Sequence, residues 1–117
     1  MSPSEPFQEL AALDRLIHEP GRLAILTALS ACESADFVFL QRLTGLSKGN
    51  LSAHLSKLEE AGLVLIRKEF VGKVPRTVVS LTESGGGGVR AYWERLERLK
   101  KEASSWAPLK GPAAEPV

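Results

Sequence analysis

One short stretch of the sequence combines an apolar stripe with polar side chains that could bind another molecule. Residues 47–64 read SKGNLSAHLSKLEEAGLV, in which Leu51, Leu55 and Leu58 recur every three or four residues. This spacing predicts a helix with one apolar face, the leucine stripe. Hydroxyl, amide and ammonium groups can bond to phosphates or base edges, and small side chains allow a close approach. Such side chains occupy the opposite face and its flanks: Gly49, Asn50, Ser52, Ala53, Ser56 and Lys57.

The start of this helix is suited to an anion. Ser47 is expected to cap it, and Lys48 adds a positive charge beside backbone N–H groups that have no partner within the helix. Phosphate binds readily at such a helix N-terminus. A merely hydrated polar face is the alternative interpretation. Three features weigh against it: a tight turn before the helix, a basic hairpin after it, and acidic side chains elsewhere in the chain.

The net charge of +1 hides an uneven distribution. Residues 1–40 carry six acidic and two basic side chains, whereas residues 41–81 carry seven basic and three acidic ones. A polyanion responds to local charge, so the middle third of the chain is the part that would attract one.

Other residues predict the elements that must position this helix. Apolar residues three or four apart predict helices over residues 7–18, 22–31 and 37–43. The third of these ends at Gly45, and only Gly45 and Leu46 separate it from Ser47, which is the pattern of a helix-turn-helix. The helix that follows, over residues 48–61, is expected to end at Gly62. The stretch CESAD, residues 32–36, is expected to be a connector.

A change of periodicity after Gly62 predicts a β-hairpin. Large aliphatic and β-branched residues predict strands over residues 63–70 and 76–81, joined by a loop that contains VGKVP. Basic hairpins can follow a nucleic-acid backbone or enter the minor groove, where the negative potential favours arginine. The charges could instead serve solubility or protect a strand edge. The basic side chains of the hairpin are Arg67, Lys68, Lys73 and Arg76.

A long amphipathic helix is predicted near the C-terminus, over about residues 88–105. Its apolar stripe outlasts the core that so small a chain can build, which indicates a partner. Gly85–Gly88 stand where this helix should begin, and each helical glycine costs about 1 kcal/mol relative to alanine. We therefore expect a late start near Val89, with a hinge at the glycines as the alternative.

Three stretches of the chain resemble winged-helix transcriptional regulators of the MarR and ArsR type. They read LDRLIHEPGRLAILTAL, GLSKGNLSAHLSKLEEAGLV and VPRTVVSLTESG, and the resemblance spans about residues 10–105. It is nearest to short MarR-like proteins that are little more than a winged helix with dimerising terminal helices. The resemblance implies a mainly α fold with a small β-hairpin: a winged helix-turn-helix with a long terminal dimerisation helix.

The resemblance also implies a homodimer that binds double-stranded DNA sequence-specifically and regulates transcription. The recognition helix, about residues 47–61, would enter the major groove, and the wing, about residues 67–77, would lie on the backbone or in the minor groove. His54 borders the leucine stripe, so it has a second interpretation, as a residue that holds the helix in place. The DNA-binding candidates are Ser47, Lys48, Asn50, Ser52, Ala53, His54, Lys57, Arg67, Lys73 and Arg76. The candidates for the dimer interface are Leu10, Leu13, Val89, Tyr92, Trp93, Leu96 and Leu99.

Composition predicts a flexible N-terminal tail over residues 1–6, one domain over residues 7–106 and a disordered tail over residues 107–117. No apolar run reaches the roughly 20 residues of a membrane span, and the N-terminus does not read as a secretory signal. We therefore expect a cytoplasmic protein without membrane contacts. Whether a small-molecule effector exists is left open.

Several other chemistries are not supported by the sequence. A metal site needs clustered ligands, but Cys32, His18 and His54 lie far apart in the chain. His18 and Cys32 are expected to be structural, with a redox-sensing thiol as the alternative for Cys32. Motifs for acid–base, nucleotide or nucleophilic chemistry are missing, so we expect neither an enzyme nor a cofactor. The alternative function is a protein-binding winged helix or an architectural DNA-binding module, without sequence-specific regulation.

Overall fold

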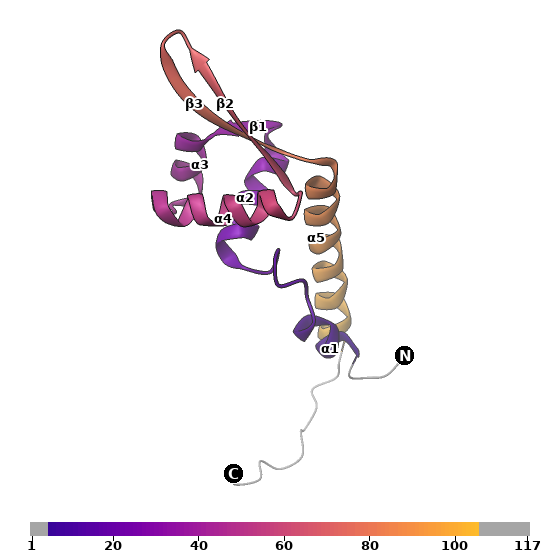
Figure 1. Ribbon diagram of the computed structural model, residues 1–117. Coiled ribbons are helices and arrows are strands. Elements are labelled where there is room, and N and C mark those ends of the chain that lie inside the picture. The colour runs from indigo at the N-terminus through magenta and orange to yellow at the C-terminus, as the bar shows by residue number, and fades with distance from the viewer. Residues whose placement is uncertain (1–4, 106–117) are drawn as a thin grey trace.

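Helix α2 (Pro20–Ala31) lies at the centre of the structure, a computed structural model that describes residues 5–105. Its residues Ile25, Leu26 and Leu29 are at most 2% exposed. Around it the described residues form four more helices and a three-stranded antiparallel sheet (Figure 1). These elements are α1 (Glu5–Ala11), β1 (Ser34–Asp36), α3 (Phe37–Thr44), α4 (Lys48–Glu60), β2 (Val64–Val71), β3 (Val74–Leu81) and α5 (Glu83–Ser104). The predicted winged helix-turn-helix with a long last helix is confirmed.

The sheet has one strand more than the sequence predicts. The expected connector contains β1, which pairs antiparallel with β3, and the strand order is β1-β3-β2. Ala35 lies opposite Val79, and both side chains are buried. Three residues are too few to show an alternating pattern, so β1 is specified by its partner strand and not by its own sequence.

The turn of the hairpin is shorter than expected. Val71 pairs with Val74, so only Gly72 and Lys73 form the turn. Gly72 has a φ of +64°, and a type II′ turn requires such a positive φ, which glycine adopts readily, at its first central position. The short turn lets both valines join the strands, and the hairpin extends away from the helices (Figure 1).

The first helix is also shorter than expected, since α1 ends at Ala11 and not at His18. The Asp14 carboxylate accepts a hydrogen bond from the Leu16 N–H at 2.8 Å, and this local turn replaces helical bonding. The Arg22 guanidinium donates to the Leu16 carbonyl at 2.7 Å, which fixes the segment against α2. Two apolar residues of this segment are still buried, Leu13 and Ile17.

The two expected tails are only partly covered by the structure. Because α1 begins at Glu5, the last two residues of the expected 1–6 tail are helical. Residues 1–4 and 106–117, and with them the whole expected C-terminal tail, lie outside the described residues.

The helix-turn-helix has the caps that the sequence predicts. Gly45 ends α3 with a φ of +69°. The Ser47 hydroxyl oxygen caps α4 by accepting the Asn50 N–H at 3.1 Å. All three leucines of the stripe are at most 3% exposed, so they determine which face of α4 points outwards.

A polar cluster of Glu19, Arg22 and His54 ties α4 to the start of α2. Glu19 caps α2 by accepting the Arg22 N–H at 2.7 Å, and its carboxylate lies 3.7 Å from His54 Nδ1. Arg22 Nη1 lies 3.3 Å from the same nitrogen. The imidazole ring rests on Gly21, where a Cβ would come within 2.6 Å of His54 Nε2. The close approach of the two helices therefore requires a glycine.

The last helix includes the glycine run, so the expectation of a late start near Val89 is wrong. It begins at Glu83, and Thr82 caps it by accepting the Gly85 N–H at 3.0 Å. A Cβ on Gly85 would overlap the Leu63 carbonyl oxygen, so this glycine permits α5 to pack against the residues before β2. The cap and this packing offset the low helix propensity of glycine.

The glycine run offers a matched pair of substitutions. We expect Gly85→Ala to lower the free energy of unfolding by about 1–3 kcal/mol, because its new methyl group would meet the Leu63 carbonyl. Gly87→Ala should raise it by up to about 1 kcal/mol, because a Cβ there meets nothing within 4 Å. Urea unfolding of both variants measures the difference. Equal effects would contradict the packing role of Gly85.

The polar cluster should make stability depend on pH. Burial alone would raise the pKa of Glu19, but hydrogen bonds from the Arg22 and Gly21 N–H groups and the charges of His54 and Arg22 lower it below its ordinary value. The unfolded chain then takes up the proton more readily than the folded chain. The stability that Glu19 contributes is therefore present above its ordinary pKa and lost as the pH falls through the lowered value.

We expect Glu19→Gln to be less stable than the wild type at neutral pH and to lose less stability on acidification. Urea unfolding at neutral and acidic pH measures both quantities. Glu33→Gln is the control, because Glu33 is exposed and forms no ion pair within residues 5–105. Parallel pH curves for the wild type and Glu19→Gln would show that Glu19 carries no such contribution.

Candidate nucleic-acid interface

The outward face of α4 is polar, basic and open to solvent. Neither Lys48 nor Lys57 forms an ion pair within the described residues, so both charges are available to a ligand. The Ser47 hydroxyl oxygen caps the helix, so the role of Ser47 is to fix the start of α4. Five predicted side chains lie exposed on this face: Lys48, Asn50, Ser52, Ala53 and Lys57.

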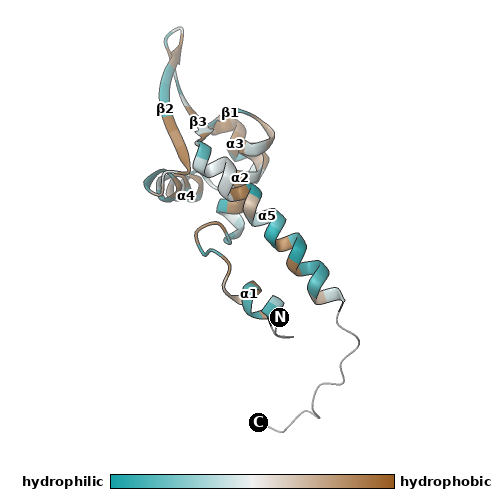
Figure 2. Ribbon diagram, turned by 90° about the vertical axis from the view of Figure 1, so that its right-hand side faces the viewer, coloured by the Kyte–Doolittle hydropathy of each residue, from teal (hydrophilic) through white to brown (hydrophobic). Residues whose placement is uncertain are grey.

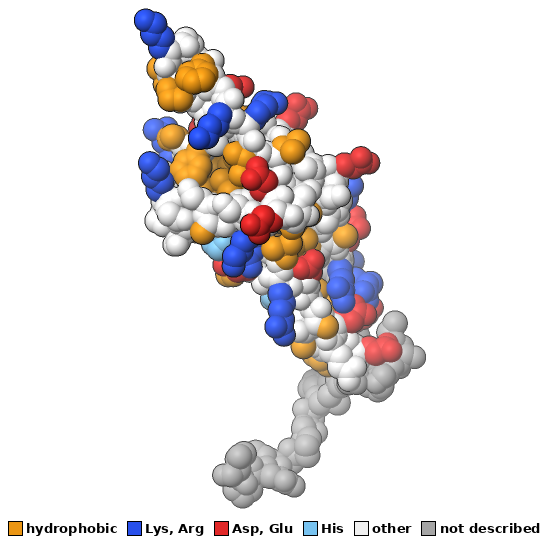
Figure 3. Space-filling model, in the orientation of Figure 1, with side chains coloured by type: hydrophobic (Ala, Val, Ile, Leu, Met, Phe, Trp, Pro, Cys, Tyr) orange, Lys and Arg blue, Asp and Glu red, His pale blue; other side chains and the backbone are white. Residues whose placement is uncertain are grey.

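The structure brings this face next to the wing. A hollow of about 710 Å³ lies between α3, α4 and β3. Lys48 and Ser52 of α4 line it, and so does Arg76 of β3. In Figure 3, basic side chains lie over the hairpin and the adjoining helices. The helix and the hairpin thus form one surface, although they are separate in the sequence.

The basic side chains of the wing differ in their partners. Glu69 lies 3.9 Å from an Arg67 nitrogen and 3.4 Å from an Arg76 nitrogen. Exposed ion pairs of this kind are weak, so both arginines can exchange the carboxylate for a phosphate. Lys68 and Lys73 are exposed, and neither forms an ion pair within residues 5–105. Lys73 lies in the turn at the end of the hairpin.

His54 is placed differently from the other candidates. Its ring packs on Gly21 beside Glu19 and Arg22, on the inner side of α4. Only 20% of its side chain is exposed. The geometry favours the second interpretation, in which His54 holds the helix in place, over a DNA contact.

Most residues expected at a dimer interface belong to the core of the chain itself. Leu10 and Leu96 are partly buried against that core, and Trp93 is 42% exposed. The stripe of α5 therefore serves mainly to join this helix to its own chain, which corrects the interface assignment of the buried members. Four residues are at most 6% exposed: Leu13, Val89, Tyr92 and Leu99.

Polar contacts also hold α5 to its own chain. The Tyr92 hydroxyl and His18 Nδ1 are hydrogen-bonded at 2.6 Å, and burial raises the pKa of the Tyr92 hydroxyl. The Trp93 indole N–H donates to the Thr27 hydroxyl at 3.1 Å. His18 thus has a structural contact, which fits the structural role expected for it, although its partner is Tyr92 and not a helix end.

Sequence reasoning missed the apolar side chains around the candidate interface. Phe37 and Val38 of α3 line the hollow, and Phe70 and Val71 are exposed near the end of the hairpin. In the sequence they read as ordinary parts of a helix and a strand. One signal was available, because the stretch FVGKVP has lysine as its only polar side chain.

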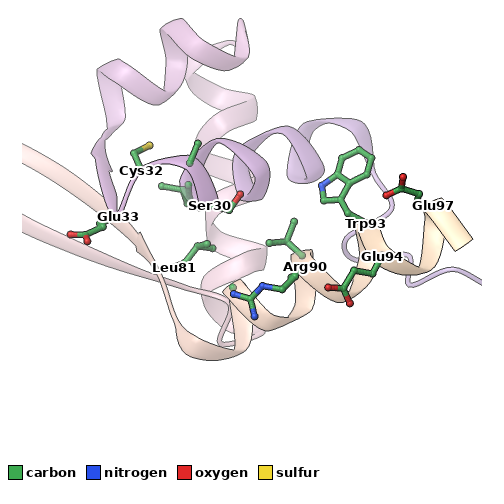
Figure 4. A pocket seen from close by; sticks show the side chains of 12 residues that line it. Ser30, Cys32, Glu33, Leu81, Arg90, Trp93, Glu94 and Glu97 are labelled. Atoms are coloured by element: carbon green, nitrogen blue, oxygen red, sulfur yellow. The ribbon is translucent and has the colours of Figure 1, made fainter.

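A second hollow, of about 650 Å³, lies away from α4, between the end of α2 and the first half of α5. Figure 4 shows Cys32 and Glu33 toward one end of it and Trp93 toward the other. The Cys32 thiol donates to the Ala28 carbonyl at 3.0 Å, which fits a structural role. The lining mixes acidic side chains with Arg90 and points to no particular ligand.

Within residues 5–105, no group of three or more His, Cys, Asp or Glu residues is placed to hold a metal ion. No helix in that range combines the length and apolar character needed to cross a membrane.

Known proteins are similar to this chain in both sequence and fold. A family model described as a winged helix DNA-binding domain matches residues 22–100. Uncharacterized protein MJ0432 of Methanocaldococcus jannaschii is 32% identical over 87 residues, which cover 74% of this chain and 95% of that protein.

Solved structures agree with this match. A transcriptional regulator homologue from Pyrococcus horikoshii OT3 superposes with a TM-score of 0.76 at 29% identity, over 85% of this chain and 97% of that chain. A MarR family transcriptional regulator from Silicibacter pomeroyi, at 21% identity, has the same fold, with a TM-score of 0.60 over 91% of this chain and 69% of that chain. This family and fold are those of DNA-binding transcriptional regulators and not of enzymes. The chain belongs to the winged helix DNA-binding domain family, and its fold is that of the MarR-type transcriptional regulators.

Proposed function

We propose that this protein binds double-stranded DNA sequence-specifically, as a homodimer, and thereby regulates transcription. The observation that carries the proposal is the shared surface of α4 and the wing, where Lys48, Ser52 and Arg76 line one hollow. If the outward face of α4 were merely hydrated, there would be no need for a basic hairpin beside it. A duplex offers phosphates to the hairpin and base edges to the helix at the same time.

The proposed roles follow from side-chain chemistry. The major groove is about 12 Å wide and admits an α-helix. Asn50, Ser52 and Lys57 can bond to base edges there. The small side chain of Ala53, which is exposed, allows the helix to approach the groove closely. Lys48 at the helix start is suited to a phosphate. On the wing, Arg67, Lys73 and Arg76 would contact phosphates or the minor groove.

The arm formed by α1 and the distal half of α5 supports the homodimer. Figures 1 and 2 show these two helices near each other and away from the hairpin and α4. The Glu9 carboxylate of α1 accepts hydrogen bonds from Arg98 at 2.8 Å and Arg95 at 3.2 Å, which lower the pKa of Glu9. With only 7 residues, α1 is too short to be stable without packing. In this chain α5 supplies that packing, and a second copy would add to it.

The geometry of such a dimer sets the spacing of the DNA site. Packing about a two-fold axis would reach Trp93, which is 42% exposed, and the outer parts of Leu10 and Leu96. The two α4 helices would then read half-sites about one helical turn apart, roughly 34–36 Å, or a multiple of it.

Selection from a random pool of double-stranded DNA, repeated at several salt concentrations, tests the proposal. The expected result is a palindrome with half-sites about 10 base pairs apart or a multiple of that. Binding with a steep salt dependence but no preferred sequence would indicate an architectural DNA-binding protein. A failure to bind DNA at moderate salt would contradict the proposal and assign the surface to a protein partner.

The wing should contribute affinity without sequence preference. We expect Lys73→Ala to weaken binding to all duplexes and to reduce the slope of log affinity against log salt by about 0.9 for each phosphate that Lys73 neutralises. Lys101→Ala, on the exposed side of α5 and away from the face that carries Trp93 and Leu96, removes the same charge elsewhere and should leave the slope unchanged. Titrations at four or five salt concentrations measure both slopes. Equal slopes for the two variants would remove Lys73 from the interface.

Asn50 should contribute sequence preference. We expect Asn50→Ala to weaken binding to the selected sequence by about 1–3 kcal/mol and to change binding to unrelated DNA little. The cap on α4 is preserved, because it uses the backbone N–H of this residue and not its amide side chain. Competition between selected and random duplexes measures the ratio. The same loss on every sequence would show that Asn50 does not read bases.

A further inference from the structure

The end of the hairpin is apolar on both of its faces. Phe70 pairs with Pro75, and Val71 with Val74, at the last two positions of the ladder. Because side chains alternate along a strand, the first pair lies on one face and the second pair on the other. Phe70, Val71 and Val74 are 71%, 56% and 64% exposed. These four residues are called the wing tip below.

Nothing within residues 5–105 buries the wing tip. On the face that carries Phe70, the base of the hairpin packs into the core, where Val64 and Val79 are at most 1% exposed. The Lys68–Thr77 pair interrupts the apolar residues on this face, and apolar side chains return at the end of the hairpin that extends into solvent, where Figure 3 shows hydrophobic side chains. Natural hairpins usually place charged or polar residues at such an end to prevent unwanted pairing. An exposed apolar cluster of this kind marks a contact surface.

The charges around the wing tip select the kind of partner. Between residues 64 and 81 the hairpin has four basic side chains and one acidic side chain, Glu69. Lys73 lies in the turn itself, between the two strands of the wing tip. An apolar end surrounded by positive charge is complementary to a polyanion that also offers an apolar interior. The stacked bases of a duplex, between two rows of phosphates, have this combination.

The wing tip also continues the surface proposed for DNA. Val74 lines the same hollow as Lys48 and Ser52 of α4. A duplex that places its major groove over α4 therefore extends toward the hairpin, and the neighbouring minor groove is the part that the wing tip would meet.

We propose that the wing tip enters this minor groove as an apolar wedge, with Phe70 inserted between two base pairs so that the duplex bends. The inference rests on the proposed function. The minor groove is about 6 Å wide, and the two strands of a hairpin already lie about 4.7–4.9 Å apart without their side chains. The groove must therefore open, and an apolar side chain that unstacks a base step opens it by kinking the duplex toward the major groove. The basic side chains beside the wing tip hold the phosphates on either side.

Two fluorescence measurements on the selected sequence test the wedge. Energy transfer between dyes at the duplex ends reports bending, and 2-aminopurine at successive positions beside each half-site reports unstacking. With the wild type we expect a bend of about 20–90° and a rise in 2-aminopurine fluorescence at one step beside each half-site. Phe70→Ala should lose both signals while the salt slope stays unchanged, because no positive charge is removed.

Leu65→Ala is the matched control. Leu65 is 61% exposed near the base of the hairpin, so its loss removes a similar apolar area away from the wing tip. Both substitutions lie on the surface, and circular dichroism melts check that both variants fold. Leu65→Ala should keep the bend and the 2-aminopurine signal.

The outcomes separate this inference from the proposed function. A straight duplex with bound wild type, or a bend that Phe70→Ala retains, would overturn the wedge and leave DNA binding intact. A wild type that binds no duplex would overturn both. A third outcome is that Phe70→Ala bends DNA as the wild type does but no longer binds phosphatidylglycerol vesicles that the wild type binds. This result would overturn the wedge and assign the wing tip to a lipid surface.

Discussion

The burial of one narrow stripe of leucines orients α4, and the candidate interface depends on it. The stripe is at most 3% exposed, so the other faces of this thirteen-residue helix point to solvent. The polar cluster around His54 adds contacts on the inner edge of the helix, and the bare backbone of Gly21 allows them. Apolar and polar contacts therefore hold α4 against the same central helix, α2. With its inner side fixed in this way, the side chains left for a ligand are small, polar and basic from Lys48 to Lys57, and the exposed acidic side chains, Glu59 and Glu60, lie at the far end of the helix.

A second close approach joins the hairpin to the long last helix. Thr82 donates its N–H to the Leu63 carbonyl at 3.1 Å and its hydroxyl to the Gly62 carbonyl at 2.6 Å. Gly85 packs over the same Leu63 carbonyl. The end of β3, the residues before β2 and the start of α5 thus meet at one junction. In the proposed homodimer, this junction would connect the arm proposed to bind the second copy to the hairpin proposed to contact DNA.

Around α4 the features that depend on neighbouring residues were predictable from the sequence, whereas features that depend on distant residues were not. The cap at Ser47, the leucine spacing and the tight turn before α4 are local signals, and the structure has them where the sequence places them. By contrast, β1 forms only on β3, and His54 turns inwards only because Gly21 leaves room for its ring. The apolar stripe of α5 was correctly located, but its buried members pack against their own chain, since spacing alone does not tell whether an apolar face meets its own chain or a second copy. The start of α5 was predicted too late for the same reason. The glycine at position 85 is needed because of its contact with Leu63, and no spacing rule relates these two residues.

The outward face of α4 is proposed to lie in the major groove of DNA, and methylation of the DNA tests this most directly. Dimethyl sulfate methylates guanine at N7, which faces the major groove, and adenine at N3, which faces the minor groove. A sparsely methylated duplex of the selected sequence is bound to the protein, and the bound and free fractions are compared position by position. If α4 lies in the major groove, N7 methylation of guanines in both half-sites excludes the duplex from the bound fraction. Interference from adenine N3 alone, with no effect of guanine methylation in either half-site, would contradict that placement.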